Sequence, residues 1–169
     1  GGVGPRKDEQ TAIRAWARIP AALRADTVLL IAGVEPESRL TRMRELIKAL
    51  GVANSVTVTG SISREEYLDL MMASRVSISC SRLESFGLPV GEALAIGAPV
   101  VCSDIQSHRE LTERANAGAT FETRSARSLS RTLAAILRGE LPPRMEDIPV
   151  NWSWAARARE HVDAYLRYP

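Results

Sequence analysis

Short apolar segments alternate with amphipathic stretches along the chain, and this alternation predicts the fold class. Residues 27–32 form a continuous β-rich run that ends at Gly33, as expected for a strand buried on both faces of a parallel sheet. Similar patterns predict strands at 55–59, 75–80, 99–102 and 119–122, with apolar positions at helical spacing between them. Strands that alternate with helices indicate an α/β fold with a doubly wound, mostly parallel sheet and helices on both faces.

Polar residues at the helix starts set the expected boundaries. Asp8 is predicted to cap a helix that runs to about Arg18, and Ser38 to cap one that stops at Gly51. The run 63–66 (SREE) is a capping box. We expect the α/β domain at 1–140, a proline-containing linker at 141–152 and a terminal helix at 153–169.

Composition narrows the class of protein. Hydrophobic residues make up 45% and charged residues 25% of the 169 residues, which is ordinary globular usage. No apolar run approaches the roughly 18–20 residues that span a membrane. The net charge is +2 and the basic residues are dispersed, so nucleic acid is not an expected partner. Because the chain begins with glycine, we expect it to be a piece of a longer protein.

The cysteine usage indicates a compartment. Cys80 and Cys102 lie in apolar segments without CxxC spacing, so we expect buried, reduced thiols and a cytoplasmic location. An alternative is contact with the inner face of the membrane through a domain outside this chain. The sequence holds no cluster of metal-ligand residues and no cofactor fingerprint, so neither a metal nor a cofactor is expected.

The segment after the third predicted strand carries the most informative chemistry. A strand ends at Cys80, and a loop with Gly87 turns directly into a helix near Pro89. Free backbone N–H groups and the helix dipole make such a turn suited to a phosphate. Glu84 and Glu92 flank the turn and would repel phosphate, so their expected targets are hydroxyl groups. A phosphate between two polyols describes a nucleotide diphosphate sugar.

This segment resembles a known family. Residues 84–101 (ESFGLPVGEALAIGAPVV) resemble the paired-glutamate motif of the retaining family 4 (group 1) glycosyltransferases, and the similarity extends over nearly the whole chain. Those enzymes have two facing Rossmann-like domains, the GT-B architecture. The chain resembles the C-terminal domain, which holds the nucleotide sugar, while the N-terminal domain holds the acceptor.

The resemblance implies a role for each matching residue. Glu84 matches the glutamate that contacts the donor sugar near its anomeric centre, and it is the expected catalytic residue. The expected donor-binding residues are the diphosphate-contacting Lys7, the base-bordering Gly60 and Ile62, the loop residues Phe86, Gly87 and Leu88, and the ribose-binding Glu92. Ser85 departs from the family pattern, because a glycine is usual at that position.

The resemblance implies a hexosyltransferase-type enzyme of polysaccharide biosynthesis. It would move a sugar from a UDP-, GDP- or ADP-sugar to the hydroxyl of a glycan or glycolipid bound by the absent domain. The isolated chain is expected to be inactive. Two alternatives stay open: half of a nucleotide-sugar epimerase, and a non-catalytic module that binds nucleotide sugars.

Overall fold

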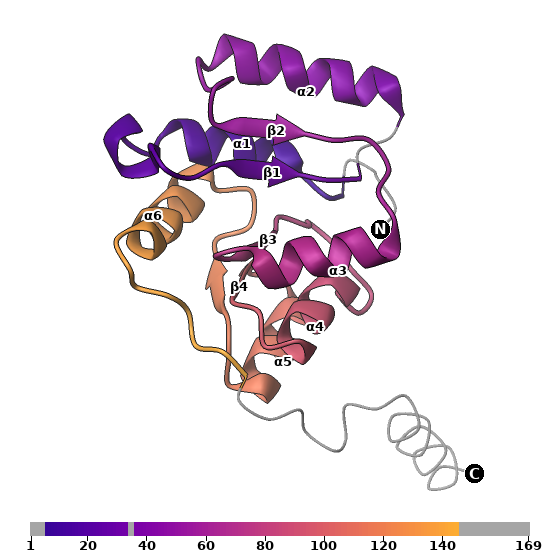
Figure 1. Cartoon of the computed structure of the whole chain (residues 1–169). Coiled ribbons are helices and arrows are strands. Elements are labelled where there is room, and N and C mark those ends of the chain that lie inside the picture. Colours follow the sequence, from indigo (N-terminus) through magenta and orange to yellow (C-terminus); the bar gives the residue numbers. More distant parts are fainter. Residues whose placement is uncertain (1–5, 34–35, 146–169) are drawn as a thin grey trace, which may run out of the picture.

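The computed structural model describes residues 6–33 and 36–145, in which helices alternate with parallel strands (Figure 1). The helices are α1 (Glu9–Ala17), α2 (Glu37–Ala49), α3 (Arg64–Ala73), α4 (Leu88–Ala95), α5 (Gln106–Ala115) and α6 (Ala126–Leu137), with a short 3-10 turn at Ala21–Arg24. The strands are β1 (Leu29–Ile31), β2 (Val56–Val58), β3 (Ser77–Ser79), β4 (Val100–Ser103) and β5 (Ala119–Phe121). The predicted α/β class is therefore confirmed. The terminal helix and most of the linker expected from the sequence lie outside the described residues.

The strands belong to two parallel sheets rather than to one. β1 pairs with β2, with Leu30 opposite Thr57, while β3, β4 and β5 form the second sheet in that order. In the second sheet, Ile78 lies opposite Val101. Alternation of strands and helices predicts parallel strands, but it carries no information on whether all of them share one sheet.

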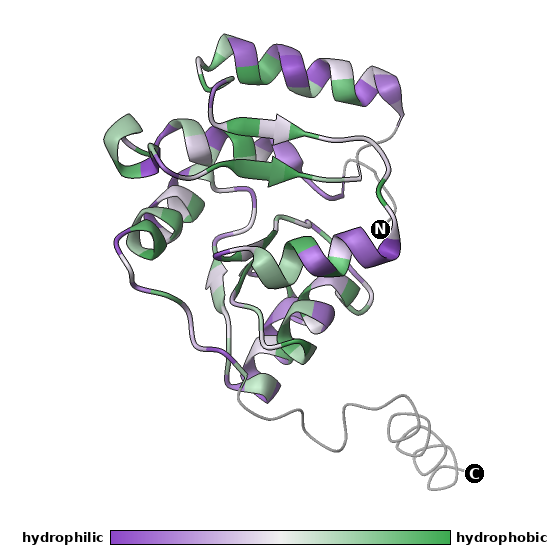
Figure 2. Ribbon diagram, viewed as in Figure 1, coloured by the Kyte–Doolittle hydropathy of each residue, from purple (hydrophilic) through white to green (hydrophobic). Residues whose placement is uncertain are grey.

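Two groups of apolar side chains form the core. One joins α1, α2 and α6 to β1 and β2, and the other joins α3, α4 and α5 to β4. Figure 2 shows hydrophobic residues concentrated in β1 and β2, while the adjacent helix α2 carries many hydrophilic residues. No helix in the described part of the chain is long and apolar enough to cross a membrane.

The predicted helix starts are confirmed at one place and corrected at two. Ser63 and Glu66 form the expected capping box at α3. The cap of α2 is Pro36 rather than Ser38, because the helix already begins at Glu37. Asp8 stands at the cap of α1 but makes no side-chain cap bond, since its carboxylate accepts from Thr11 and Arg82 instead.

Candidate active site

A lysine and a glutamate that lie 77 residues apart in the sequence meet beside the β3–α4 loop. Lys7 Nζ lies 2.5 Å from Glu84 Oε1, and both side chains are largely buried. The backbone fixes this approach, because the N–H of Arg82 donates to the carbonyl of Arg6 at 2.6 Å. Arg82 also pairs with the buried Asp8 at 2.8 Å. Arg82 thus bonds to Arg6 and to Asp8, the neighbours of Lys7 on both sides, and this brings Lys7 to Glu84.

Glu84 is held as a carboxylate with one oxygen available to a ligand. Ser81 Oγ donates to Glu84 Oε1 at 2.8 Å, beside the bond from Lys7. Burial raises the pKa of Glu84, but the bonds from Lys7 and Ser81 outweigh burial, so its pKa lies below the ordinary value. Among the described residues, none donates to the second oxygen, Oε2. That oxygen can accept a hydrogen bond from a sugar hydroxyl.

The loop enters α4 through Gly87, which has the positive φ of 85° that favours glycine. The first N–H groups of a helix lack intrahelical partners, and the helix dipole adds partial positive charge there. Pro89 lies in this first turn, where its missing N–H costs little. Phe86 and Leu88 flank Gly87 with exposed side chains. The loop therefore presents both backbone donors and apolar surface to a ligand.

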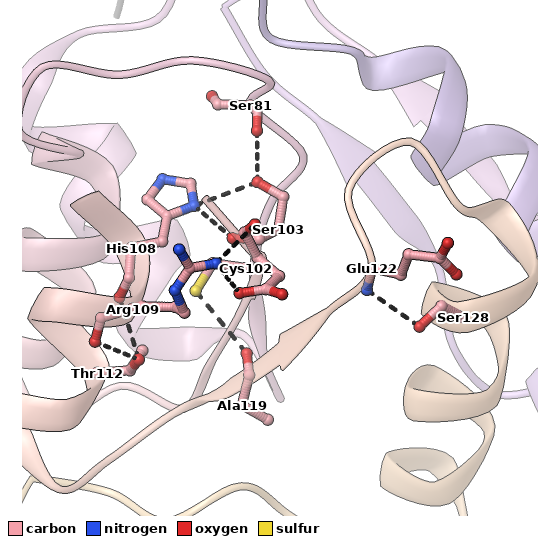
Figure 3. Close-up of polar contacts among 10 residues, drawn as sticks. Ser81, Cys102, Ser103, His108, Arg109, Thr112, Ala119, Glu122 and Ser128 are labelled. Atoms are coloured by element: carbon pink, nitrogen blue, oxygen red, sulfur yellow. Dashed lines mark hydrogen bonds and ion pairs between the residues drawn. The ribbon is translucent and has the colours of Figure 1, made fainter. Parts of the chain in front are cut away.

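His108 packs against Gly87 in this loop, and Figure 3 shows its hydrogen bonds to Ser103. Ser103 Oγ donates to the carbonyl of Ser81, and the His108 Nδ1–H donates to the carbonyl of Ser103 at 3.0 Å. The proton is therefore assigned to Nδ1. Nε2 is buried without a partner in the described structure, and a Cβ on Gly87 would lie 3.3 Å from it.

Burial also sets the charge of His108. Removal from water disfavours the imidazolium and lowers the pKa of His108 below 6.5, although the Ser103 carbonyl and Glu84 oppose this shift. His108 is neutral at pH 7 and packs directly against the glycine turn. It lies in α5, and among the described residues only one of its ring nitrogens has a partner.

Glu92, one turn into α4, is held by α3. Arg64 Nη1 lies 2.6 Å from Glu92 Oε1, and Tyr67 on the same helix lies close enough for this carboxylate to act on its phenol. Burial and the neighbouring Glu92 raise the pKa of Tyr67 well above its ordinary value, so the phenol is a donor. The Arg64 side chain is 66% exposed, whereas that of Glu92 is 20% exposed. Arg64 can therefore move away from Glu92 without opening the core.

Gly60 and Ile62 lie between β2 and α3, and both are half-buried. The Gly60 carbonyl accepts from the N–H of Gly33, so the ends of β1 and β2 are tied together. Among the described residues, no hydrogen bond or ion pair links these two positions to Glu84 or Gly87.

The sequence interpretation missed Arg64 and Asp8 as parts of this site. Arg64 was assigned only to a capping box, yet it pairs with Glu92 from 28 positions away. Asp8 was assigned only to a cap, yet it holds Arg82 at the loop. Neither long-range pairing has a local sequence signal.

The described structure is thus a Rossmann-like α/β domain in which a helix N-terminus, a lysine and two glutamates lie after the carboxyl end of β3. The family description "Glycosyl transferases group 1" matches residues 1–159, and the chain belongs to that family. This confirms the resemblance on which the expected site residues were based.

Individual relatives are longer than this chain. The chain is 26% identical over 164 residues to the lipopolysaccharide glucosyltransferase WaaG of Escherichia coli, covering 96% of the chain and 40% of WaaG. It is 27% identical over 172 residues to the serotype-specific mannosyltransferase WbdA of Escherichia coli, covering 98% of the chain and 21% of WbdA. The chain therefore spans less than half of either relative.

Solved structures share the fold. A crystal structure of WaaG matches with a TM-score of 0.70 at 24% identity, over 94% of this chain and 40% of that one. Anabaena HepE in complex with UDP and glucose matches with a TM-score of 0.67 at 20% identity, over the whole of this chain and 47% of that one. At these identities the likeness shows the fold alone.

Proposed function

We propose that the chain is the donor-binding domain of a retaining glycosyltransferase that moves a sugar from a nucleotide diphosphate sugar to an acceptor hydroxyl. The observation that carries the proposal is the meeting of Lys7 with Glu84 beside the N-terminus of α4. This arrangement offers positive charge for a diphosphate and a carboxylate oxygen for a sugar hydroxyl. HepE, a structural relative, was crystallised with UDP and glucose.

Each group has a role in the proposed reaction. Bond cleavage at the anomeric carbon leaves both electrons on the diphosphate oxygen, and Lys7 and the N–H groups at Gly87 and α4 stabilise that developing charge. Glu84 accepts a hydrogen bond from a sugar hydroxyl and orients the ring. The acceptor hydroxyl, held by the part of the protein outside this chain, attacks the anomeric carbon, and its proton passes to the departing diphosphate oxygen.

Glu92 is assigned to the ribose. A carboxylate can accept two hydrogen bonds from a neighbouring pair of hydroxyls. Arg64 holds the Glu92 carboxylate in place at the helix. In this proposal the exposed Arg64 yields its position to the ribose. The cytoplasmic location expected from the two cysteines stays a prediction.

Nucleoside diphosphate binding tests the two glutamate roles separately. Glu92→Ala should weaken binding of UDP, GDP or ADP by about 1.5–3 kcal/mol, as expected for hydrogen bonds to a charged group. Glu84→Gln should leave this affinity within about threefold, because these ligands carry no sugar ring for Glu84 to contact. Calorimetric titration of the three nucleotides in parallel measures both effects. Glu45→Ala, an exposed glutamate on α2, is the matched control.

Turnover by the full-length protein completes the test. Glu84→Gln should lower kcat and kcat/KM together, because the interaction strengthens in the transition state. Near-normal turnover of Glu84→Gln would contradict its role. Failure of the unaltered chain to bind any of the three nucleotides would overturn the proposed function.

A further inference from the structure

Residues 6–8 are attached to the β3–α4 loop at two points, with Lys7 between them. The carbonyl of Arg6 accepts from the Arg82 N–H at 2.6 Å, and the carboxylate of Asp8 accepts from the Arg82 guanidinium at 2.8 Å. The backbone and the side chain of one loop residue therefore hold both neighbours of Lys7. Because the two attachments lie on either side of position 7, they restrict where the Lys7 ammonium can lie.

Asp8 has a backbone conformation that its side chain helps to maintain. Its backbone is left-handed, with a φ of 49° and a ψ of 41°, which few residues other than glycine, asparagine and aspartate adopt. The side chain is 4% exposed, and burial of an unpaired carboxylate is costly. Arg82 and the Thr11 hydroxyl, which donates at 2.9 Å, compensate for this burial. The turn at Asp8 is thus fixed through its carboxylate.

The same loop segment also holds the partner of Lys7. Ser81 Oγ donates to Glu84 Oε1, the oxygen that accepts from Lys7 Nζ. Arg82 follows Ser81 directly, so one short segment holds the glutamate and the backbone on both sides of the lysine. A lysine side chain is a flexible four-carbon stem, and its ammonium keeps a fixed place only if the backbone from which it extends is fixed.

The charge of Asp8 makes a positioning role testable. A carboxylate repels a phosphate group. Charge alone therefore predicts that a neutral residue at position 8 strengthens the binding of an anion. A positioning role predicts the opposite result, because loss of the Arg82 attachment releases the Lys7 ammonium from its place. The two roles of Asp8 thus differ in the sign of the effect on binding.

We propose that Asp8 and Arg82 are positioning residues that fix the Lys7 ammonium against Glu84 and thereby set how tightly the diphosphate is held. This inference rests on the proposed function, because it requires that Lys7 contacts the diphosphate. Asp8 and Arg82 do not contact the ligand themselves. Arg82 provides the attachment, and Asp8 passes it through the left-handed turn to the residue before it.

Calorimetric titration of the full-length protein with UDP, GDP and ADP tests the inference. Glycine and asparagine both tolerate the left-handed backbone at position 8. Asp8→Asn keeps an oxygen for Arg82 and should retain the affinity for the tightest of the three nucleotides within about twofold, whereas Asp8→Gly loses the attachment and should bind about five- to tenfold more weakly. Asp26→Gly, which removes the same charge from an exposed turn, is the matched control and should change the affinity by less than about twofold.

A Lys7→Met background separates positioning from direct contact. Lys7→Met should itself weaken nucleotide binding by about tenfold or more, since a charge-assisted contact with the diphosphate is lost. Asp8→Gly should then weaken binding by no more than about a further twofold, because no ammonium is left to position. A full further loss in this background would overturn the inference. Stronger binding by Asp8→Gly in the otherwise unaltered protein, or equal losses in Asp8→Gly and Asp8→Asn, would do the same.

A second variant removes the attachment without a change of net charge. Arg82→Ala combined with Asp8→Asn should show the same loss of affinity and the same dependence on Lys7, so the test does not depend on the folding of Asp8→Gly alone. If Lys7→Met binds the nucleotides as tightly as the unaltered protein does, the diphosphate role of Lys7 in the proposed function is wrong. If Lys7→Met weakens binding and the attachment variants do not, the proposed function stands and the positioning role is wrong.

Discussion

Gly87 is constrained both by its backbone conformation and by its close neighbours in the β3–α4 loop. Its φ is +85°, and a Cβ there would lie 2.9 Å from His108 Cδ2. Gly87 also caps α4, three residues after Glu84, so the turn sets where the helix begins. A side chain at position 87 would therefore be expected to shift the start of α4 and the groups beside it.

Gly87→Ala should destabilise the chain by about 2–5 kcal/mol, since a left-handed backbone costs about 1–2 kcal/mol and overpacking adds about 1–3 kcal/mol. Gly51→Ala isolates the backbone cost, because Gly51 has a φ of +66° with nothing within 4 Å of a Cβ. Urea unfolding measures both variants. Equal losses of unfolding free energy in Gly87→Ala and Gly51→Ala would show that His108 moves aside at no measurable cost. If the contact is real, His108→Ala should be less harmful in the Gly87→Ala chain than in the unaltered chain.

At the scale of elements, α3 joins a strong helix start to the proposed ribose site. Ser63 Oγ accepts from the Glu66 N–H at 3.1 Å, and Glu66 Oε2 accepts from the Ser63 N–H at 2.8 Å. Both bonds hold the first turn, from which Arg64 reaches Glu92. The order of this turn and the position of the Glu92 carboxylate are thus coupled.

Ser63→Ala should cost about 1 kcal/mol of unfolding free energy, within the 0.5–2 kcal/mol range for lost N-caps. It should weaken nucleoside diphosphate binding by no more than about threefold, because in the proposed complex Arg64 has already given up its place on Glu92 to the ribose. Ser63→Asp keeps a capping oxygen and should restore most of the stability. Thermal unfolding and calorimetry of the three proteins measure this. An Ala variant as stable as the unaltered chain would contradict the role of the cap.

Features formed by residues close together in the sequence could be predicted, whereas those formed by distant residues could not. The capping box at Ser63 and the glycine turn at Gly87 are local, and both were predicted. The pairing of Arg64 with Glu92 joins different helices, and residue pattern alone gives no signal for it. The Lys7 and Glu84 roles came from the family resemblance, while their contact became visible only in the fold.

At the scale of the whole molecule, the division into two sheets is what the sequence did not predict. Five apolar runs predicted five parallel strands, and all five are present. Hydrophobic runs specify burial, whereas strand neighbours are selected by groups distant in the chain. The apolar runs therefore could not show that β1 and β3 lie at the ends of separate sheets. The terminal helix expected at 153–169 lies outside the described residues and stays a prediction.

The chain should bind a nucleoside diphosphate but transfer no sugar at a useful rate, because positioning an acceptor against the donor supplies several kcal/mol of barrier reduction. The chain spans 40% of WaaG, which leaves much of such a protein unaccounted for. Product formation from a nucleotide sugar, followed with the chain and with the full-length protein at equal concentration, measures this. Comparable rates would place the acceptor site within these 169 residues.

The two buried cysteines make the chain suited to single-site labelling. Both thiols are free, and burial raises the pKa of Cys102 to about 12 and that of Cys80 further above its ordinary value. Thiol reagents attack the thiolate, so neither side chain competes for a maleimide dye in the folded protein. Leu83 is 64% exposed and adjoins Glu84. A dye on Leu83→Cys would therefore be the one label on the chain, placed where its emission can follow a nucleotide arriving at the loop in real time.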